Sequence, residues 1–228
     1  GDHRDLHLSL RRQRQMCIRD RVNRNPLGPF TTSTLQQTAS SRLGFGASRT
    51  MQIAQKLYQG IEIEGETIGL ITYMRTDGTN LSKDAVSTFR DYIKNEIGNE
   101  YLPKDALNYS GKKAKNAQEA HEAIRPTDII RTPQSIKKYL STDQNKLYDL
   151  IWSRALSSQM ESAKFDRNTI TITSDNNDTI CKASGSVLKF DGFIKIYNNQ
   201  SKDDDENILP TMSKGTVSYT HLTLPTKA

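Results

Sequence analysis

The sequence has little cysteine, little histidine and no long apolar run. Its 228 residues include only two cysteines and four histidines, and two cysteines are too few for the disulfide framework of a small secreted protein. No apolar run approaches the roughly 20 residues that a transmembrane helix needs. No apolar block follows the charged N-terminus, as it would in a signal peptide. These absences predict a soluble, cytosolic protein without a membrane partner.

The two ends of the chain do not read like native protein. Residues 11–20 (RRQRQMCIRD) can be back-translated into DNA whose reverse complement encodes VSYTHLTLPT, which is residues 217–226. This DNA resembles the adapter of transposon-based sequencing libraries, and GDHRDLH at residues 1–7 fits the outer part of such an adapter. We therefore expect residues 1–21 and 216–228 to be adapter-derived and the native piece to be an internal fragment. The alternative is a genuine basic arm and a genuine polar tail.

Setting these ends aside removes most of the evidence for a basic chain. They hold seven of the 32 basic and three of the 26 acidic residues, so the formal charge falls from +6 to +2. Of the histidines and cysteines only His121 and Cys181 remain, which argues against a zinc site within the chain. The acidic run at residues 201–207 has no glycine at a calcium-loop position, so it indicates a solvated loop.

The central part of the chain predicts an α+β protein, with helices first and strands later. Helical spacing, caps and breaks predict helices over residues 31–43, 48–59, 82–97, 117–124, 134–139 and 141–155. Ser48 and Ser82 are expected to cap the second and third helices, and Ser141 with Gln144 forms a capping-box pattern for the last one. The buried stripe of the second helix is expected to be Met51, Ala54, Leu57 and Tyr58. Apolar runs and alternation predict strands at 68–74, 169–173, 180–184, 187–190 and 193–197, and a hairpin turn at Gly65. We expect a linker at 22–28, a helical domain at 29–162 and a β-rich segment at 163–215.

The segment from Ile71 to Asp77 (ITYMRTD) combines a tyrosine and an arginine that suit phosphoryl chemistry. In an extended segment Tyr73 and Arg75, two residues apart, point to the same side. A tyrosine hydroxyl can attack phosphorus and hold a covalent ester, and the arginine fork can stabilise the charged transition state. By spacing alone, a buried tyrosine at a strand end followed by a surface arginine explains the pattern better than a catalytic pair does.

Several segments together resemble the bacterial type IA DNA topoisomerases. GLITYMRTD at residues 69–77 is similar to the active-site motif of that family, and QEAHEAIRP at 118–126 is similar to its second signature. Further similar segments follow in family order at residues 29–37, 43–45, 147–152 and 190–193. Met74, where the topoisomerase III branch has proline, favours the topoisomerase I branch. Gly78 departs from the family's usual serine.

The resemblance implies a specific reaction and specific roles. Tyr73 would cut one DNA strand through a 5′-phosphotyrosine, let the intact strand pass and allow resealing without ATP, which relaxes negatively supercoiled DNA. Arg75 would hold the scissile phosphate, and His121 would contact DNA or help to position the tyrosine. Arg125 is a further DNA-contact candidate, although an arginine before proline can instead brace the turn. The implied partner is a single-stranded segment of negatively supercoiled duplex, bound by a monomer in the bacterial cytoplasm and nucleoid.

The resemblance also implies a fold and a missing part. Residues 29–162 would form a winged-helix-like gate domain, and residues 163–215 would form part of a β-rich arch. The Mg²⁺ ligands of the family lie in a separate N-terminal domain, and no Asp-x-Asp-x-Glu pattern occurs in residues 22–215. We therefore expect the chain to carry the nucleophile but to be inactive alone.

Two alternatives remain for the function. The first two predicted helices have a helix-turn-helix outline, which fits a non-catalytic DNA-binding module. In the second of them only Arg49 and Lys56 are basic, which is little for a recognition helix. The other alternative is the topoisomerase part of a reverse gyrase.

Overall fold

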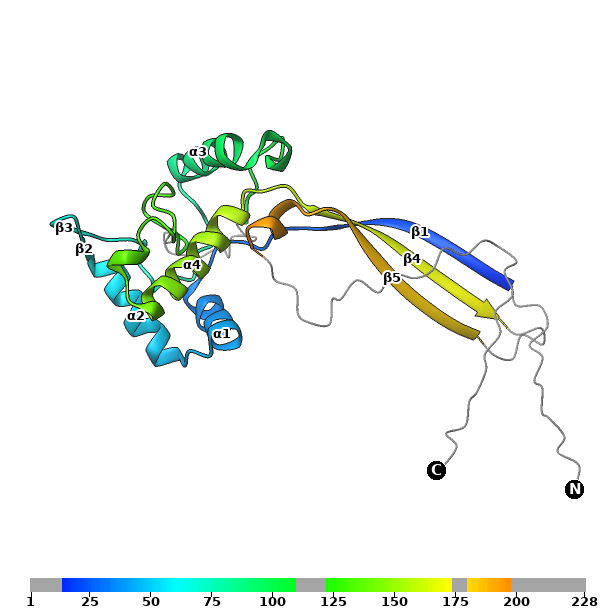
Figure 1. The fold of residues 1–228 in the computed structure, drawn as a ribbon, viewed down its shortest axis with the longest axis horizontal. Coiled ribbons are helices and arrows are strands. Elements are labelled where there is room, and N and C mark those ends of the chain that lie inside the picture. Colours follow the sequence, from blue (N-terminus) through cyan, green and yellow to red (C-terminus); the bar gives the residue numbers. More distant parts are fainter. Residues whose placement is uncertain (1–13, 110–121, 174–179, 198–228) are drawn as a thin grey trace, which may run out of the picture. The chain divides into compact units, whose positions relative to one another are not determined.

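The computed structural model describes residues 14–109, 122–173 and 180–197, and it divides the chain into two compact units (Figure 1). The larger unit is mainly helical and comprises residues 24–163 and 191–197. The smaller unit is a sheet formed by residues 14–23, 164–173 and 180–190. The predicted α+β fold class is confirmed.

The helical unit begins with two packed helices, α1 (Thr32–Leu43) and α2 (Ala47–Gln59). Thr31 caps α1 in a capping box with Thr34, as a short polar side chain at this position should. Gly44 ends the helix in the left-handed conformation with φ 69°, a geometry that favours glycine.

α2 differs from the sequence-based prediction in where it begins and in which of its faces is buried. Its N-cap is Gly46 and not Ser48, which lies within the first turn. The buried positions are Thr50, Ile53, Ala54 and Leu57. Tyr58 was expected on this stripe but is 41% exposed, because the buried stripe runs through Ile53 and Leu57 and leaves the following position on the open side.

A short hairpin, β2 (Ile61–Ile63) and β3 (Glu66–Ile68), follows α2 as predicted. Its turn places both Glu64 (φ 54°) and Gly65 (φ 89°) at positive φ, the geometry of tight two-residue hairpins. The predicted strand over residues 68–74 is wrong beyond Ile68. Beyond that residue the chain is irregular, with a single β-bridge between Ile71 and Pro126.

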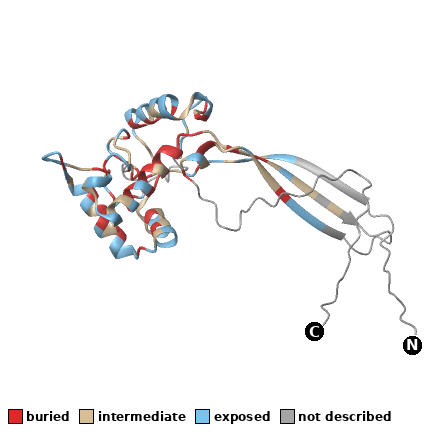
Figure 2. Cartoon of the chain, in the orientation of Figure 1, coloured by how far each residue is buried: buried red, intermediate tan, exposed pale blue. Residues whose placement is uncertain are grey.

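The remaining helices surround a central one. α3 (Lys83–Tyr92) continues into a π-helical turn, η1 (Ile93–Ile97), and a 3₁₀ turn, η2 (Asn99–Tyr101). α4 (Thr142–Ser157) starts with the predicted capping box of Ser141 and Gln144, and it packs on α1 and α2. Buried residues occupy much of α4 (Figure 2), and its Trp152 indole N–H donates to the Ile129 carbonyl at 3.0 Å. α4 therefore forms the buried core on which α1 and α2 pack.

Two further helix predictions need correction. The expected helix over 134–139 is reduced to a 3₁₀ turn, η3 (Lys137–Tyr139). The expected helix over 117–124 lies partly outside the described residues, and its described end is extended. There Glu122 forms a β-bridge with Asn80, and Ile124 forms one with Phe30. Backbone partners from distant segments therefore take the place of the hydrogen bonds that a helix would make within itself.

The smaller unit is a three-stranded sheet of order β1-β4-β5. Its strands are β1 (Arg14–Arg24), β4 (Ala163–Thr173) and β5 (Ile180–Phe190). β4 and β5 are antiparallel, as predicted, but β5 is one strand where two were expected, because Gly185 pairs with Asn168 without a break. The predicted strand over 193–197 is instead a 3₁₀ turn, η4 (Gly192–Lys195), which Gly192 starts at φ 49°. None of the described helices is long and apolar enough to cross a bilayer.

Candidate active site

The segment around Tyr73 alternates between exposed and buried side chains. Tyr73 is 45% exposed and Arg75 is exposed, whereas Met74 is 1% and Thr76 is 6% exposed. Although the segment forms no regular strand, it keeps the period of two of an extended chain. Tyr73 and Arg75 therefore both lie on its solvent side.

Thr32, at the start of α1, fixes the C-terminal half of this segment. Its hydroxyl oxygen lies 2.7 Å from the Met74 carbonyl and 3.0 Å from the Thr76 carbonyl, and it accepts the Thr76 N–H at 2.8 Å. The Thr32 N–H donates to the Thr76 carbonyl at 2.8 Å. Arg75 is thus held between two anchored neighbours while its own side chain stays free to face solvent.

The second signature fixes the N-terminal half. The Thr72 N–H donates to the Arg125 carbonyl at 2.9 Å, and the Thr72 hydroxyl donates to the Ala123 carbonyl at 2.8 Å. Thr127 donates through its N–H to Leu70 at 3.0 Å and through its hydroxyl to Gly69 at 2.7 Å. The two sequence motifs therefore lie side by side.

The last turn of α2 also contacts the segment. The Leu70 N–H donates to the Leu57 carbonyl at 2.8 Å. The rings of Tyr58 and Tyr73 form an edge-to-face pair, with 5.4 Å between centroids and 64° between planes. Tyr58 was not predicted as a site residue, because its position after Leu57 fits the apolar stripe of the helix.

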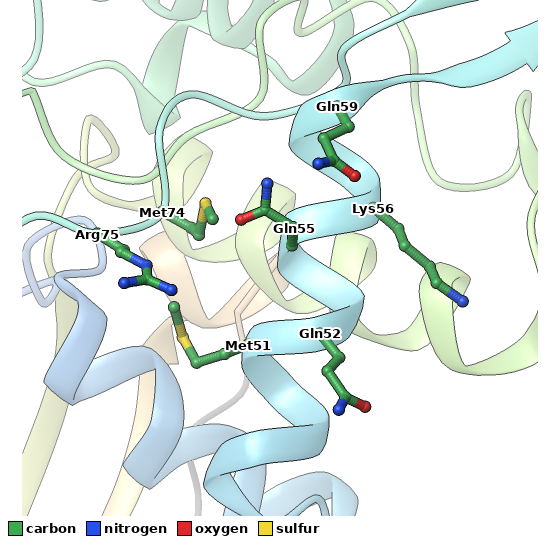
Figure 3. A pocket seen from close by; sticks show the side chains of 7 residues that line it. All are labelled: Met51, Gln52, Gln55, Lys56, Gln59, Met74 and Arg75. Atoms are coloured by element: carbon green, nitrogen blue, oxygen red, sulfur yellow. The ribbon is translucent and has the colours of Figure 1, made fainter.

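A groove of about 370 Å³ lies between α2 and the segment (Figure 3). Its lining is formed by Met51, Gln52, Gln55, Lys56, Gln59, Met74 and Arg75. Met51 and Gln55 point from α2 toward Met74 and Arg75, whereas Lys56 points away from them (Figure 3). This lining was not predicted from the sequence either, although the glutamines at positions 52, 55 and 59 have helical spacing.

The other two candidate residues are placed differently. His121 lies outside the described residues. The Arg125 guanidinium pairs with Glu122, with Nε 2.6 Å from Oε1 and Nη2 3.1 Å from Oε2, and Nη1 donates to the Pro126 carbonyl at 3.0 Å. This is the bracing arrangement that an arginine before proline can form, so a DNA contact by Arg125 stays a prediction.

The electrostatics of the Glu122–Arg125 pair favour the ionised carboxylate. Burial raises the pKa of the Glu122 carboxyl, but hydrogen bonds from Arg125 and Ser82 and the charge of Arg125 outweigh that effect. The pKa of Glu122 therefore lies below its ordinary value, and the pair stays charged at neutral pH.

The described residues do not fit a resident divalent metal. Across residues 14–109, 122–173 and 180–197, no three His, Cys, Asp or Glu side chains gather where they could hold an ion. The acidic run at 201–207 lies outside the described residues. The described residues therefore offer a tyrosine, an arginine and a polar groove for chemistry.

Comparison with known proteins identifies the family. The family model described as DNA topoisomerase matches residues 13–227, which includes parts of both ends that we predict to be adapter-derived. DNA topoisomerase 1 of Rickettsia prowazekii is 49% identical over 207 residues, which are 90% of this chain and 26% of that protein. DNA topoisomerase 1 of Xylella fastidiosa (strain 9a5c) is 47% identical over 199 residues, which are 84% of this chain and 24% of that protein.

The fold agrees with this sequence similarity. Full-length topoisomerase I from Thermotoga maritima matches with a TM-score of 0.75 and 35% sequence identity, over 89% of this chain and 32% of that chain. The chain thus spans about a quarter of the length of the curated relatives that it matches. With a family match over nearly the whole chain and a common fold, the protein belongs to the bacterial type IA DNA topoisomerases.

Proposed function

We propose that this chain carries the nucleophile of an ATP-independent topoisomerase that relaxes negatively supercoiled DNA. The observation that supports it most directly is that Tyr73 and Arg75 are both exposed on the solvent side of a segment anchored at both ends. An exposed phenol and an exposed guanidinium, two residues apart on a backbone fixed by hydrogen bonds, suit attack on a phosphodiester.

The proposed step is a transesterification. The Tyr73 phenolic oxygen attacks the phosphorus of one DNA strand, the new phosphorus–oxygen bond forms, and the bond from phosphorus to the 3′ oxygen breaks. The phenol loses its proton and the departing 3′ oxygen gains one, so a free 3′-hydroxyl and a 5′-phosphotyrosine result. After the other strand has passed, the reverse step restores the backbone, and no ATP is consumed because the bond energy is kept in the ester.

Arg75 and the groove would place the strand for this step. The guanidinium has fixed charge and several donors for the scissile phosphate. The groove beside it offers the amide of Gln55 for a base or sugar and the side chain of Met51 for a base face. This combination of cationic, polar and apolar side chains suits a single strand with exposed bases.

Other parts of the proposal rest on the family alone. A complete enzyme would act as a monomer on single-stranded segments of supercoiled DNA, in the cytoplasm and at the nucleoid of a bacterium. Its Mg²⁺ would be held by residues of another domain. His121 is proposed to contact DNA or position Tyr73, and Arg125 stays a candidate DNA contact whose described role is to brace the turn.

The alternatives differ in what they require of α2 and Tyr73. A helix-turn-helix binding module needs a basic recognition helix, but Arg49 of α2 is engaged by Asp143, which leaves little positive charge on that surface. A reverse gyrase would use Tyr73 in the same way and would differ only outside this segment.

The test uses a complete topoisomerase that contains this segment. The Tyr73→Phe variant should bind single-stranded DNA with unchanged affinity and should form no covalent complex with a labelled oligonucleotide. Retained covalent capture by this variant would refute the proposal. The 228-residue chain alone, mixed with negatively supercoiled plasmid and Mg²⁺, should give no relaxation.

A further inference from the structure

We propose that Tyr58 is a positioning residue, whose ring holds the ring of Tyr73 in the orientation from which it attacks. This inference rests on the proposed function, because it assigns Tyr58 a role in the reaction of Tyr73. It concerns a residue on a different element, 15 positions earlier in the chain, at the last turn of α2.

The two rings are an isolated contact on an open surface. Tyr58 is 41% and Tyr73 is 45% exposed, and both are among the few large hydrophobic side chains of the described residues that are exposed. Their edge-to-face geometry, 5.4 Å and 64°, is the favourable arrangement for two aromatic rings. An exposed tyrosine without such a neighbour would sample several rotamers, so the contact selects among them for Tyr73.

The backbones beneath the rings are fixed with respect to each other. The Leu70 N–H donates to the Leu57 carbonyl at 2.8 Å. A Cβ at Gly69 would lie 2.8 Å from the Tyr58 carbonyl oxygen, so only glycine allows this close approach without a shift. The ring contact therefore follows from a rigid junction between α2 and the nucleophile segment.

This arrangement explains why an aromatic residue stands at an exposed helix end. Tyr58 keeps 41% of its surface exposed, and among the described residues its hydroxyl makes no hydrogen bond, so burial in the core does not account for this residue. Arg75, two residues after Tyr73, lines the groove beside α2. Tyr58 would thus fix the phenol while Arg75 receives the phosphate.

The experiment measures single-turnover cleavage of a labelled oligonucleotide by a complete topoisomerase that contains this segment. Tyr58→Ala and Tyr58→Leu should each slow cleavage about 10-fold, because a misplaced reacting group loses rate steeply. Tyr58→Phe, which keeps the ring, should cleave within about 2-fold of the unmodified enzyme. The control is Tyr92→Ala, which removes a different edge-to-face contact, that of the half-buried Tyr92 at the end of α3 with the buried Trp152 at 5.8 Å, and should leave the rate within about 2-fold.

A binding measurement separates positioning from direct contact with DNA. In a Tyr73→Phe background, Tyr58→Ala should leave the affinity for the same oligonucleotide within about 2-fold. Cleavage by Tyr58→Leu at the unmodified rate, or a Tyr58→Phe variant as slow as Tyr58→Leu, would overturn the inference. A parallel loss of affinity would also overturn it, because Tyr58 would then act on the DNA. Failure of the proposed function itself would appear differently, as covalent capture by Tyr73→Phe.

Discussion

Thr72 and Arg125 exchange two hydrogen bonds across 53 positions of sequence: the Thr72 N–H donates to the Arg125 carbonyl, and the Arg125 N–H donates to the Thr72 hydroxyl. The Thr72 hydroxyl in turn donates to the Ala123 carbonyl. One small side chain thus joins the segment of the nucleophile to the second signature. This junction holds the two motifs side by side in the fold.

Replacing Thr72 by valine should destabilise the helical unit. Valine keeps the shape but removes the hydroxyl, which leaves the Arg125 N–H and the Ala123 carbonyl without this partner. We expect a loss of about 1–3 kcal/mol in the free energy of unfolding, the usual cost of stranding a partly buried polar group. Urea denaturation measures it. The control is Thr88→Val, whose exposed hydroxyl donates only to the Asp84 carbonyl within α3, and which should change stability by less than about 0.5 kcal/mol.

Replacing Gly69 by alanine should disturb the junction between α2 and the nucleophile segment. The new Cβ would meet the Tyr58 carbonyl oxygen at 2.8 Å, and backbone cannot move aside as a flexible side chain can. We expect about 1–3 kcal/mol of destabilisation, in the range of overpacked sites, measured as a lower melting temperature. Gly46→Ala is the matched control, because a Cβ there meets nothing within 4 Å. Equal melting temperatures for both variants would contradict the described close approach.

Stability should fall in acid because of the Glu122–Arg125 pair. The pKa of Glu122 is lowered in the folded state, so the folded protein binds its proton less readily than the unfolded chain does. The pair therefore contributes stability above the unfolded carboxyl pKa of about 4.3, and this contribution is lost as the pH falls through the lowered folded value. Denaturation between pH 7 and pH 3 measures the slope. Glu122→Gln and Arg125→Met should each flatten it, and an unchanged slope in both would count against the pair.

Arg75 should matter for the chemical step more than for binding. In a complete topoisomerase, Arg75→Ala should slow oligonucleotide cleavage about 100-fold, the scale of losing one donor to a charged transition state. Arg75→Lys keeps the charge but lacks the forked donors. Its cleavage rate should therefore lie between the rates of the alanine variant and the unmodified enzyme. Single-turnover rates at saturating DNA provide the measurement. If the alanine variant cleaves at the unmodified rate once DNA is saturating, Arg75 contributes to DNA binding and not to the chemical step.

The flanking DNA decides the origin of the two ends. We expect the genomic sequence to depart from the chain before residue 22 and after residue 215. The family match covers residues 13–227, and strand β1 includes residues 14–21. Because both include parts of the ends in question, their adapter origin stays a prediction. Genomic sequence that encodes residues 1–21 in frame would show that the arm is genuine.

What the sequence could predict was mostly local. Ser82 and Ser141 cap their helices as predicted, because the capping side chain bonds within its own turn. The shared side of Tyr73 and Arg75 follows from the period of two, which holds even where no strand forms.

What it could not predict depends on distant partners. The expected strand through Ile71 is irregular because its hydrogen bonds go to Thr32, Arg125 and Thr127 instead of to one neighbouring strand. Tyr58 was assigned to the core because an aromatic residue next to Leu57 fits an apolar stripe as well as an exposed site. The glutamines of the groove carry no apolar signal at all, so only the packing of α2 against residues 74–75 shows them as a lining.

The most direct test is to find the atom that becomes joined to DNA. A complete topoisomerase containing this segment is trapped on an oligonucleotide, digested, and the DNA-linked peptide is identified by mass spectrometry. We predict that the attached residue is Tyr73, linked to a 5′ phosphate. Attachment at any other residue, or through a 3′ phosphate, would contradict the account.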